Sequence, residues 1–501
     1  MTKKTTLNQM LKEADSIGDY YAYLQQQTFY LLIDAFKSTR PHLVKQNDTK
    51  SLLEWRLRAL SKMGALTKQV VALISRSTGR SKGYIYALIH DNGLKVAREM
   101  NQELSKTLHK PLKNVSQDTM LIINSYASQT FRDVDNYVNQ TMLDTNYHRN
   151  PALKAYQKII DNTVLQVSTG LKTTQQAIQD GIYKMYDEGL KSSFVDKGGH
   201  NWSVEGYTRM VTQSTTTRTF NDVRMQSMKE FDSVLATMTS HACARPACAP
   251  IQGKVVNIVP KSDPRFNKKY PTIYDHGYGE KSGTFGINCR HMLYPYIEGV
   301  SHNFQKQVDP EQAIKNGKIE AKQRAYERKI RALKYKKLSA ERVGDPSGAS
   351  KFQHQISGYQ AKLRTLVKQH KFLARQYGRE KIYPNMEEID KKAANIRLTV
   401  NPDKQARHIF GTPEYKAALE NRKTDPSYFT ISPKELNDII QKGADRKQAF
   451  QNYQYIDAEK IVGVYKDESG NAVKTTRMKI MQSKNGYHAV PAPPKSQEKK
   501  K

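Results

Sequence analysis

Residues 19–36 read DYYAYLQQQTFYLLIDAF, and this stretch decides the fold of the first part of the chain. Its apolar residues recur mostly at intervals of three and four, at Tyr20, Tyr23, Leu24, Phe29, Leu31, Leu32 and Phe36. That spacing places them along one side of an α-helix, where they would be buried against other helices. We therefore predict an amphipathic helix over this stretch.

The same spacing recurs in two further stretches of the first 190 residues. Apolar positions at residues 70–96 flank a GRSKG sequence at residues 79–83, which predicts two helices separated by a break. Residues 173–189 predict another helix, with Gly189 as its stop. We expect residues 1–190 to form a helical bundle whose apolar side chains are core rather than ligand sites.

The composition limits the classes of protein that this chain can belong to. Its 501 residues fit about three domains at roughly 150 residues each. The 81 Lys and Arg exceed the 48 Asp and Glu, and a net charge of +33 predicts a polyanionic partner. No apolar run reaches the roughly 20 residues of a membrane span. The N-terminus lacks a secretion pattern, so we expect synthesis in a cytoplasm.

All three cysteines lie in residues 191–304, which we predict to be a small Cys/His-rich α+β segment. An odd number of cysteines so close together favours a local site over a disulfide framework. The candidate metal ligands are His241, Cys243, Cys248, Cys289 and His291. Four of them in a tetrahedral arrangement would suit a structural zinc ion. The alternative is a set of small buried thiols with a packed histidine, and the spacing leaves both open.

Residues 305–397 are strongly basic and have the apolar spacing of long helices. Residues 316–384 contain eighteen Lys and Arg and five Asp and Glu. A GDPSG turn at residues 344–348 divides this segment, which predicts two antiparallel helical arms followed by a linker. Such a charge run is either a solvated helix face or a contact with nucleic acid. The candidate DNA contacts are Lys322, Arg324, Arg328, Arg331, Lys334 and Lys337.

Strand patterns follow, at residues 459–465 and 477–481, with a turn at residues 468–471 between them. We predict a small α+β domain over residues 398–494, followed by a polar tail at residues 495–501.

That domain contains a histidine near each of its ends, His408 and His488. Metal-independent RNA cleavage needs a general base, a general acid and cations beside the phosphate. The two histidines with Lys404, Arg477 and Lys484 would supply these groups, which makes the domain a candidate ribonuclease. The alternative is a protein-contact domain in which both histidines are merely packed or hydrogen-bonded.

Several uncommon short sequence motifs follow one another along residues 10–345. They are WSVEGY at residues 202–207, HACARP at 241–246, NCRH at 288–291 and QRAYERKIR at 323–331. This series resembles the phage minor capsid proteins related to the Mu F-like head-morphogenesis family. The resemblance implies a structural protein of the capsid interior near the portal, made in the host bacterium. Its implied partners are the portal protein, other capsid proteins and packaged DNA.

The same resemblance bears on the metal ligands. In that family the position of Cys248 is often His and that of Cys243 is often Gly. The exchange of one ligand type for another favours a metal, and it implies His241, Cys248, Cys289 and His291 as the tetrad.

The last domain resembles a second family through the words KQARHIFGTPEY at residues 404–415 and GYHAVP at 486–491. These are similar to the polymorphic toxin type 50 domain, which implies a ribonuclease-like fold. The favoured hypothesis is a minor capsid protein that carries a nuclease-like effector domain. The rival is a stand-alone nucleic-acid-processing enzyme whose basic helical arms bind the substrate.

Overall fold

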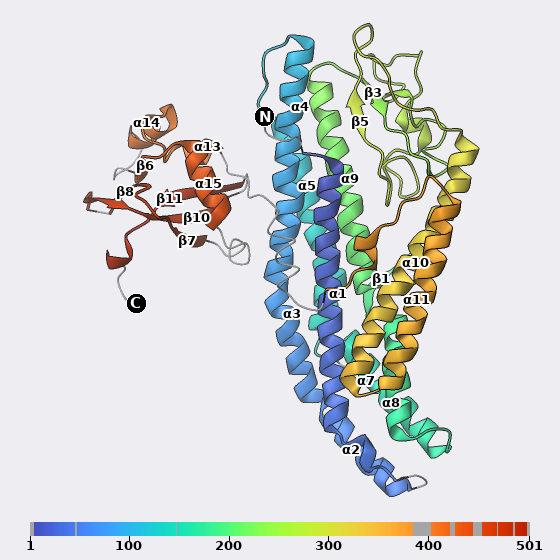
Figure 1. Ribbon diagram of the computed structural model, residues 1–501. Helices are drawn as coiled ribbons and strands as arrows, with labels where there is room; N and C mark the ends of the chain where they lie inside the picture. Colours follow the sequence, from blue (N-terminus) through green and yellow to red (C-terminus); the bar gives the residue numbers. More distant parts are fainter. Residues whose placement is uncertain are drawn as a thin grey trace.

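The computed structural model describes residues 5–45, 48–146, 148–383, 402–420, 426–443, 453–467, 469–483 and 486–497. Long helices dominate the first and middle regions, and small sheets appear in the Cys/His-containing segment and after residue 402 (Figure 1). The predicted fold class is therefore confirmed. Among the described residues, no helix is long and apolar enough to cross a membrane.

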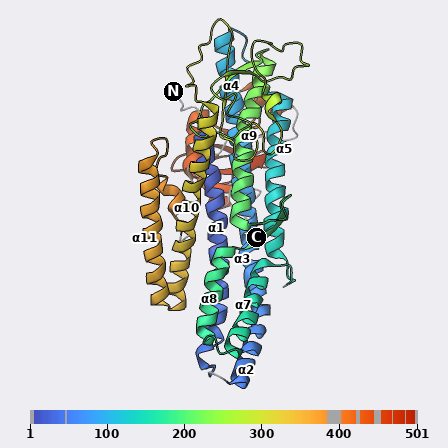
Figure 2. The same ribbon diagram turned by 90° about the vertical axis from the view of Figure 1, so that its right-hand side faces the viewer.

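The bundle is built from helices that lie alongside one another (Figures 1 and 2). Their bounds are α1 (Leu7–Ser38), α2 (Thr49–Ser61), α3 (Met63–Tyr86), α4 (Asn92–Leu108), α5 (Gln117–Val134), α6 (Gln140–Leu143), α7 (Pro151–Ser168), α8 (Thr174–Glu188) and α9 (Val204–Glu230). Single π-helical turns at Ala87–Asp91 and Asp135–Asn139 connect α3 to α4 and α5 to α6.

α1 contains the helix predicted at residues 19–36 and extends it at both ends. It begins after Thr6, whose hydroxyl accepts a hydrogen bond from the Gln9 amide at 3.2 Å and so caps the first turn. Phe36 is buried and stacks on Tyr156 of α7, with ring centroids 4.3 Å apart. The apolar side of α1 is thus the core of the bundle, as predicted.

α9 lies against α1, α4 and α5, although its sequence is rich in threonine. Its buried hydroxyls are satisfied within the helix: Thr208, Thr212 and Thr216 each donate to the carbonyl four residues earlier, at 2.7–2.9 Å. A threonine-rich helix can therefore occupy the interior without unpaired hydroxyls. The hydrophobic core also crosses the boundary predicted at residue 190, since it includes Phe220 and Val223 of α9.

The helix break predicted at residues 79–83 is wrong. α3 continues through both glycines to Tyr86, and the irregularity falls in the π-turn that follows. Ile74 and Ile85, on either side, are both buried in the bundle core. Tertiary packing here outweighs the roughly 1 kcal/mol that each glycine costs a helix. The helix predicted at residues 173–189 is confirmed as α8, which stops at Gly189.

The Cys/His-rich segment contains two small antiparallel sheets. A hairpin is formed by β1 (Lys191–Val195) and β2 (Asn201–Ser203). A three-stranded sheet has the order β4-β3-β5, from β3 (Leu235–Met238), β4 (Val255–Asn257) and β5 (Leu293–Pro295). Its core includes Cys248 and Cys289 and is completed by Met100 of α4 and Met225 of α9.

The predicted basic arms form a helical hairpin, α10 (Pro310–Val343) and α11 (Pro346–Gln369). α10 ends at Gly344, whose φ of +82° suits a glycine, and Asp345 caps α11. Ile330, Leu333, Ile356 and Leu363 are buried in the seam between the two helices. Figure 2 shows the hairpin beside α1.

Several cations of this hairpin attach it to the bundle instead of facing solvent. Lys336 pairs with Asp187 of α8, and Arg331 donates to Glu205 of α9 at 3.0 Å. Lys334 instead donates to the carbonyl of Glu380, in the segment after α11, at 2.8 Å. Lys322 and Arg328 are exposed. Of the six candidate DNA contacts, those two are the ones that the fold leaves most accessible.

The described residues after 402 form a small α+β unit. Its elements are α13 (Pro402–Ala406), α14 (Pro413–Glu420), β6 (Tyr428–Phe429), α15 (Pro433–Gly443), β7 (Tyr453–Asp457), β8 (Gly463–Lys466), β9 (Ala472–Thr475), β10 (Arg477–Ser483) and β11 (Gly486–Pro491). They make two antiparallel sheets with the orders β11-β10-β7 and β6-β8-β9. One core, which includes Phe429, Ile440 and Ile480, joins both sheets to α15.

Candidate functional site

Cys248, Cys289 and His291 meet in the core of the Cys/His-rich segment, and all three are buried. Cys248 lies in the loop between β3 and β4, while Cys289 and His291 come directly before β5. Pairing of β3 with both strands brings the two loops together. The sulfurs of Cys248 and Cys289 are 3.9 Å apart, and Cys289 Sγ is 3.4 Å from His291 Nδ1.

The surroundings orient the histidine of this group. His291 Nε2 lies 3.0 Å from the side-chain oxygen of Gln252, so Nε2 carries the proton and Nδ1 is left facing Cys289. The Asn221 side chain of α9 donates to the His291 carbonyl at 3.0 Å. A buried partner that fixes the ring and its tautomer is typical of a metal-bound histidine. Sequence reasoning missed Gln252 and Asn221, because amides far along the chain carry no spacing signal.

These distances fit a tetrahedral zinc ion. Zinc lies about 2.3 Å from a ligand sulfur and about 2.0 Å from a ligand nitrogen. In a tetrahedral site two sulfurs would therefore be roughly 3.8 Å apart, and a sulfur and a nitrogen roughly 3.6 Å apart. The observed separations of 3.9 Å and 3.4 Å are close to both. The group could therefore hold a metal ion with two thiolates and one imidazole.

The other two predicted ligands are placed differently. The His241 ring lies beside that of His291, with centroids 4.7 Å apart, and burial lowers its pKa to about 4. His241 thus lies beside the three-residue group but outside the set whose ligand atoms all lie within 4.8 Å of one another. Cys243 is half-buried beside Glu320 of α10, where burial and that carboxylate raise the thiol pKa to about 12. The structure does not bring Cys243 into the group.

In the C-terminal unit, His408 and His488 face one another. Their rings are stacked with centroids 6.1 Å apart and an angle of 16° between the planes. His408 follows α13, and His488 lies on β11, an edge strand. The Gln405 side chain joins these elements: it accepts from the Ala489 amide at 2.8 Å and donates to the Ala489 carbonyl at 3.1 Å. One amide thereby fixes α13 against the strand.

The two histidines have different electrostatic environments. Burial lowers the pKa of His488 to about 4, and His408, Lys404 and Arg407 add to the effect. His488 is therefore neutral at pH 7 and available as a base. His408 Nδ1 lies 3.0 Å from the Ser427 carbonyl oxygen and donates a hydrogen bond to it.

The structure brings together only some of the predicted catalytic residues. Lys404 is near the histidine pair, together with Arg407, which sequence reasoning missed although both belong to the same word. Arg477 is elsewhere on the sheet: its Nε is 3.6 Å from Asp457 and its guanidinium covers the Tyr455 ring. It is four residues along β10 from the partner of His488, or about 13 Å. Lys484 lies outside the described residues.

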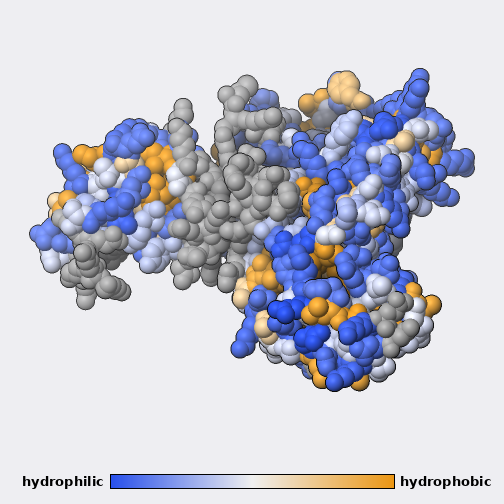
Figure 3. Space-filling model, turned by 60° about the horizontal axis from the view of Figure 1, so that its bottom comes forward, coloured by the Kyte–Doolittle hydropathy of each residue, from blue (hydrophilic) through white to orange (hydrophobic). Residues whose placement is uncertain are grey.

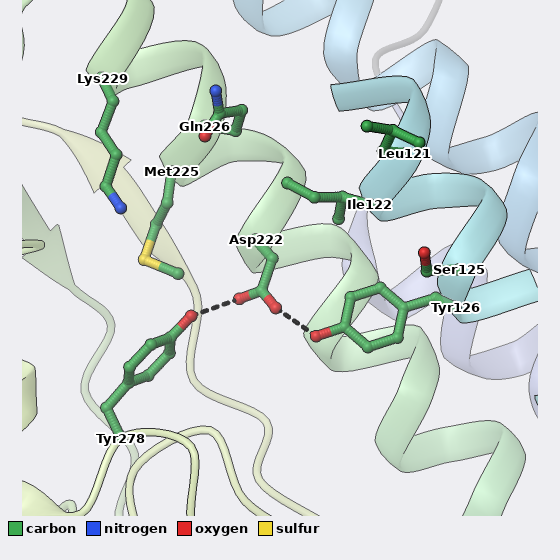
Figure 4. A pocket seen from close by; sticks show the side chains of 9 residues that line it. All are labelled: Leu121, Ile122, Ser125, Tyr126, Asp222, Met225, Gln226, Lys229 and Tyr278. Carbon is green, nitrogen blue, oxygen red and sulfur yellow. Dashed lines mark hydrogen bonds between the residues drawn. The ribbon is translucent and has the colours of Figure 1, made fainter. Parts of the chain in front are cut away.

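A pocket of about 390 Å³ lies between α5, α9 and the loop carrying Tyr278 (Figure 4). Asp222 accepts hydrogen bonds from Tyr126 at 2.5 Å and from Tyr278 at 2.9 Å. Burial raises its pKa in spite of both bonds. Each carboxylate oxygen of Asp222 thus already has a tyrosine partner. We therefore interpret Asp222 as a structural residue whose hydrogen bonds connect α5, α9 and the loop.

Residues 7–368 match the family model "Phage minor capsid protein 2". The chain belongs to this family. The match covers the helical bundle, the Cys/His group and most of the helical hairpin, and it confirms the prediction of a phage minor capsid protein.

Two phage relatives of this minor capsid protein agree with the match. A "Structural protein" of Lactococcus phage LL-H is 52% identical over 365 residues, which are 73% of this chain and 98% of that relative. A "Structural protein" of Lactococcus phage mv4 is 56% identical over 120 residues, which are 24% of this chain and 98% of the relative. No solved structure matches the chain.

A second family model, "Bacterial toxin 50", matches residues 400–491 of the minor capsid protein. That range contains both His408 and His488, so the predicted toxin-type domain is confirmed. The chain is thus a phage structural protein with a C-terminal toxin domain, and it is located in the virion.

Proposed function

We propose that this chain is located inside the phage head near the portal, where it contacts packaged DNA, and that its C-terminal domain cleaves RNA. The observation that carries the cleavage proposal is the stacked pair of His408 and His488 within the toxin-family region. Membership of a minor capsid family favours this function over the rival stand-alone enzyme. The net charge of +33 suits a location beside packaged DNA.

The arrangement of the pair supports a specific cleavage chemistry. Neutral His488 takes the proton of the ribose 2′-hydroxyl, and the 2′-oxygen forms a bond to phosphorus. The bond from phosphorus to the 5′-oxygen breaks, and His408 Nε2 donates a proton to that leaving oxygen. The products are a 2′,3′-cyclic phosphate and a 5′-hydroxyl. Lys404 and Arg407 stabilise the charge that develops on the phosphate.

The test uses the full chain with RNA and a chelator. Wild type should cleave the RNA without added metal, and His408→Ala or His488→Ala should each lower the rate about a hundredfold or more. His354→Ala, an exposed histidine of α11, is the matched control and should leave the rate unchanged. Intact RNA over a broad pH range, with a folded C-terminal domain, would favour the protein-contact alternative.

The location is tested on assembled heads. A chain inside the capsid should co-sediment with heads and resist a protease added outside. Digestion of the chain by that protease in intact heads would contradict the interior location.

The contact of this chain with other capsid proteins has a candidate surface at the α2 end of the bundle. That end is mostly hydrophilic with small hydrophobic groups (Figure 3), and Leu53, Leu57 and Leu165 are exposed there.

For the Cys/His group, we infer that the bound metal is zinc and that its role is structural. Cys248, Cys289 and His291 would supply three ligands, and His241 is the candidate for the fourth. Two thiolates and imidazole are ligands that zinc prefers, and four protein ligands would close the site to catalysis. Zinc would hold together a segment with short strands and a small core.

A further inference from the structure

The sheet β11-β10-β7 has one face against the core and one face toward solvent. Along β7, Tyr453, Tyr455 and Asp457 are exposed, while the residues between them are buried. The strand register places Met481 between Tyr453 and His488, so these three side chains form one row across the sheet. The outward face that carries His488 is therefore the face that carries both tyrosines.

Each of these tyrosines has a cation against its ring. Lys479 Nζ is 4.0 Å from the centroid of Tyr453, and the Arg477 guanidinium is 4.2 Å from that of Tyr455. Tyr453 and Tyr455 remain 49% and 38% exposed, respectively, whereas Arg477 is only 7% exposed. Arg477 also approaches Asp457, the one carboxylate of this face among the described residues. Exposed aromatic rings beside cations are the combination with which proteins bind single-stranded nucleic acid, through base stacking and phosphate contact.

The distance to the histidine pair suits a substrate that spans both. Tyr453 and His488 are two strands apart in the same row, or roughly 10 Å. A strand whose scissile phosphate lies between His408 and His488 can therefore place a neighbouring base over Tyr453 or Tyr455. A duplex would keep its bases paired and offer no free base to stack.

We propose that Tyr453 and Tyr455, with Lys479, form a binding platform for single-stranded RNA next to the histidine pair. This proposal rests on the ribonuclease function proposed above, because it assigns that site its substrate class. Binding has little dependence on base identity, since every base can stack. Arg477, predicted as a catalytic residue, is buried and would then support the Tyr455 ring instead of taking part in proton transfer.

The test measures binding by the full chain to a short 2′-O-methyl RNA, which lacks the attacking hydroxyl and cannot be cleaved. Elevated salt suppresses electrostatic binding elsewhere on this basic protein. Tyr453→Ala and Tyr455→Ala should each weaken binding at least about fivefold. Tyr455→Phe keeps the ring and should bind as wild type does. Tyr377→Ala is the matched control, because Tyr377 is exposed and also lies beside an arginine, Arg375, but is far from this domain in sequence.

A second measurement locates the contact. The same oligonucleotide with 5-iodouracil, crosslinked by light and mapped by mass spectrometry, should attach to Tyr453 or Tyr455. Crosslinks confined to α10 and α11, or equal losses in the Tyr377→Ala variant, would overturn the platform.

Failure of the platform and failure of the ribonuclease function give different results. If the Tyr453→Ala/Tyr455→Ala variant cleaves RNA with unchanged KM and kcat, the platform proposal is contradicted and the ribonuclease function is retained. Crosslinks on these tyrosines in a chain that leaves ordinary RNA intact would remove the ribonuclease function and retain the platform.

Discussion

Arg331 of α10 donates a hydrogen bond to Glu205 Oε1 of α9 at 3.0 Å, and the same oxygen accepts from Arg209 at 2.8 Å. Arg209 in turn donates to Asp19 of α1 at 2.6 Å. These side chains are mostly buried. Burial opposes ionisation of Glu205, but the two arginines hold its pKa below the usual value. The network joins α1, α9 and the basic hairpin into one unit.

Glu205→Gln should therefore destabilise the bundle by about 3–5 kcal/mol, because it leaves two buried arginines without their shared carboxylate. Urea unfolding of the full chain measures this loss. Glu311→Gln is the control: Glu311 is exposed and pairs with Lys315, which is also exposed, so its replacement should cost under about 1 kcal/mol. Equal effects of the two substitutions would show that the network adds no particular stability.

The Cys/His group gives a prediction about metal content. The wild-type chain should contain about one zinc per molecule, and Cys289→Ser should lose the metal and lower Tm, because a structural metal contributes folding free energy. Cys243→Ser is the matched control, since this thiol lies outside the group, and it should keep the zinc. A metal-free wild type whose stability is unaffected by chelators would instead support buried thiols with a packed histidine.

Gln405 gives a prediction about positioning in the toxin-family domain. Gln405→Leu removes both bonds to Ala489 and leaves a buried amide and carbonyl unpaired, at a cost of about 1–3 kcal/mol. The RNA-cleavage kcat should fall because His408 is no longer held against His488. Gln353→Leu on the exposed side of α11 should change neither quantity. Unchanged kcat in a destabilised Gln405→Leu variant would show that the amide stabilises the fold without positioning His408.

His488 gives a prediction about pH. Its folded pKa of about 4 is below the ordinary value of 6.5, so the unfolded chain binds more protons between these values. His488 therefore contributes stability that is present above about pH 6.5 and is lost as the pH falls toward 4. Calorimetry between pH 4 and 7 should show Tm of the C-terminal domain falling over this window, and less steeply in His488→Gln. Parallel Tm curves for the two proteins would contradict the assignment.

The sequence predicted those features that depend on local spacing. The periodic apolar residues of α1, the glycine stop of α8 and the turn at Gly344 all acted locally and were confirmed. The GRSKG sequence was read by the same local rule, and it failed because buried neighbours keep α3 helical. Rules based on local sequence could not predict that tertiary packing keeps residues 79–83 helical.

The site residues also differ in whether their partners are near or far in the sequence. Cys289 and His291 are two residues apart and were found together, whereas Gln252 reaches His291 across 39 positions and was missed. Whether a lysine or arginine of α10 faces solvent or an acidic residue also depends on distant partners, such as Glu205 for Arg331. The charge run alone could not make that distinction.

That division leads to a prediction about DNA. Lys322 and Arg328 are exposed on α10, while Arg331 and Lys336 are engaged with the bundle. If the hairpin contacts packaged DNA, Lys322→Glu/Arg328→Glu should weaken duplex binding uniformly across sequences. It should also reduce the slope of log K against log salt by about 2, since each neutralised phosphate contributes about 0.9. Filter binding over a salt series measures both quantities.

The control for this prediction changes the same charge elsewhere. Lys268→Glu/Lys281→Glu alters two exposed lysines of the Cys/His-rich segment and should leave the salt slope nearly unchanged. If both double variants reduce the slope equally, the DNA contact is spread over the surface and α10 has no special part in it. If neither does, the exposed cations of the hairpin form a solvated face, and the charge of +33 acts through other residues. A loss confined to Lys322→Glu/Arg328→Glu would place the DNA contact on the side of α10 that its ion pairs leave open.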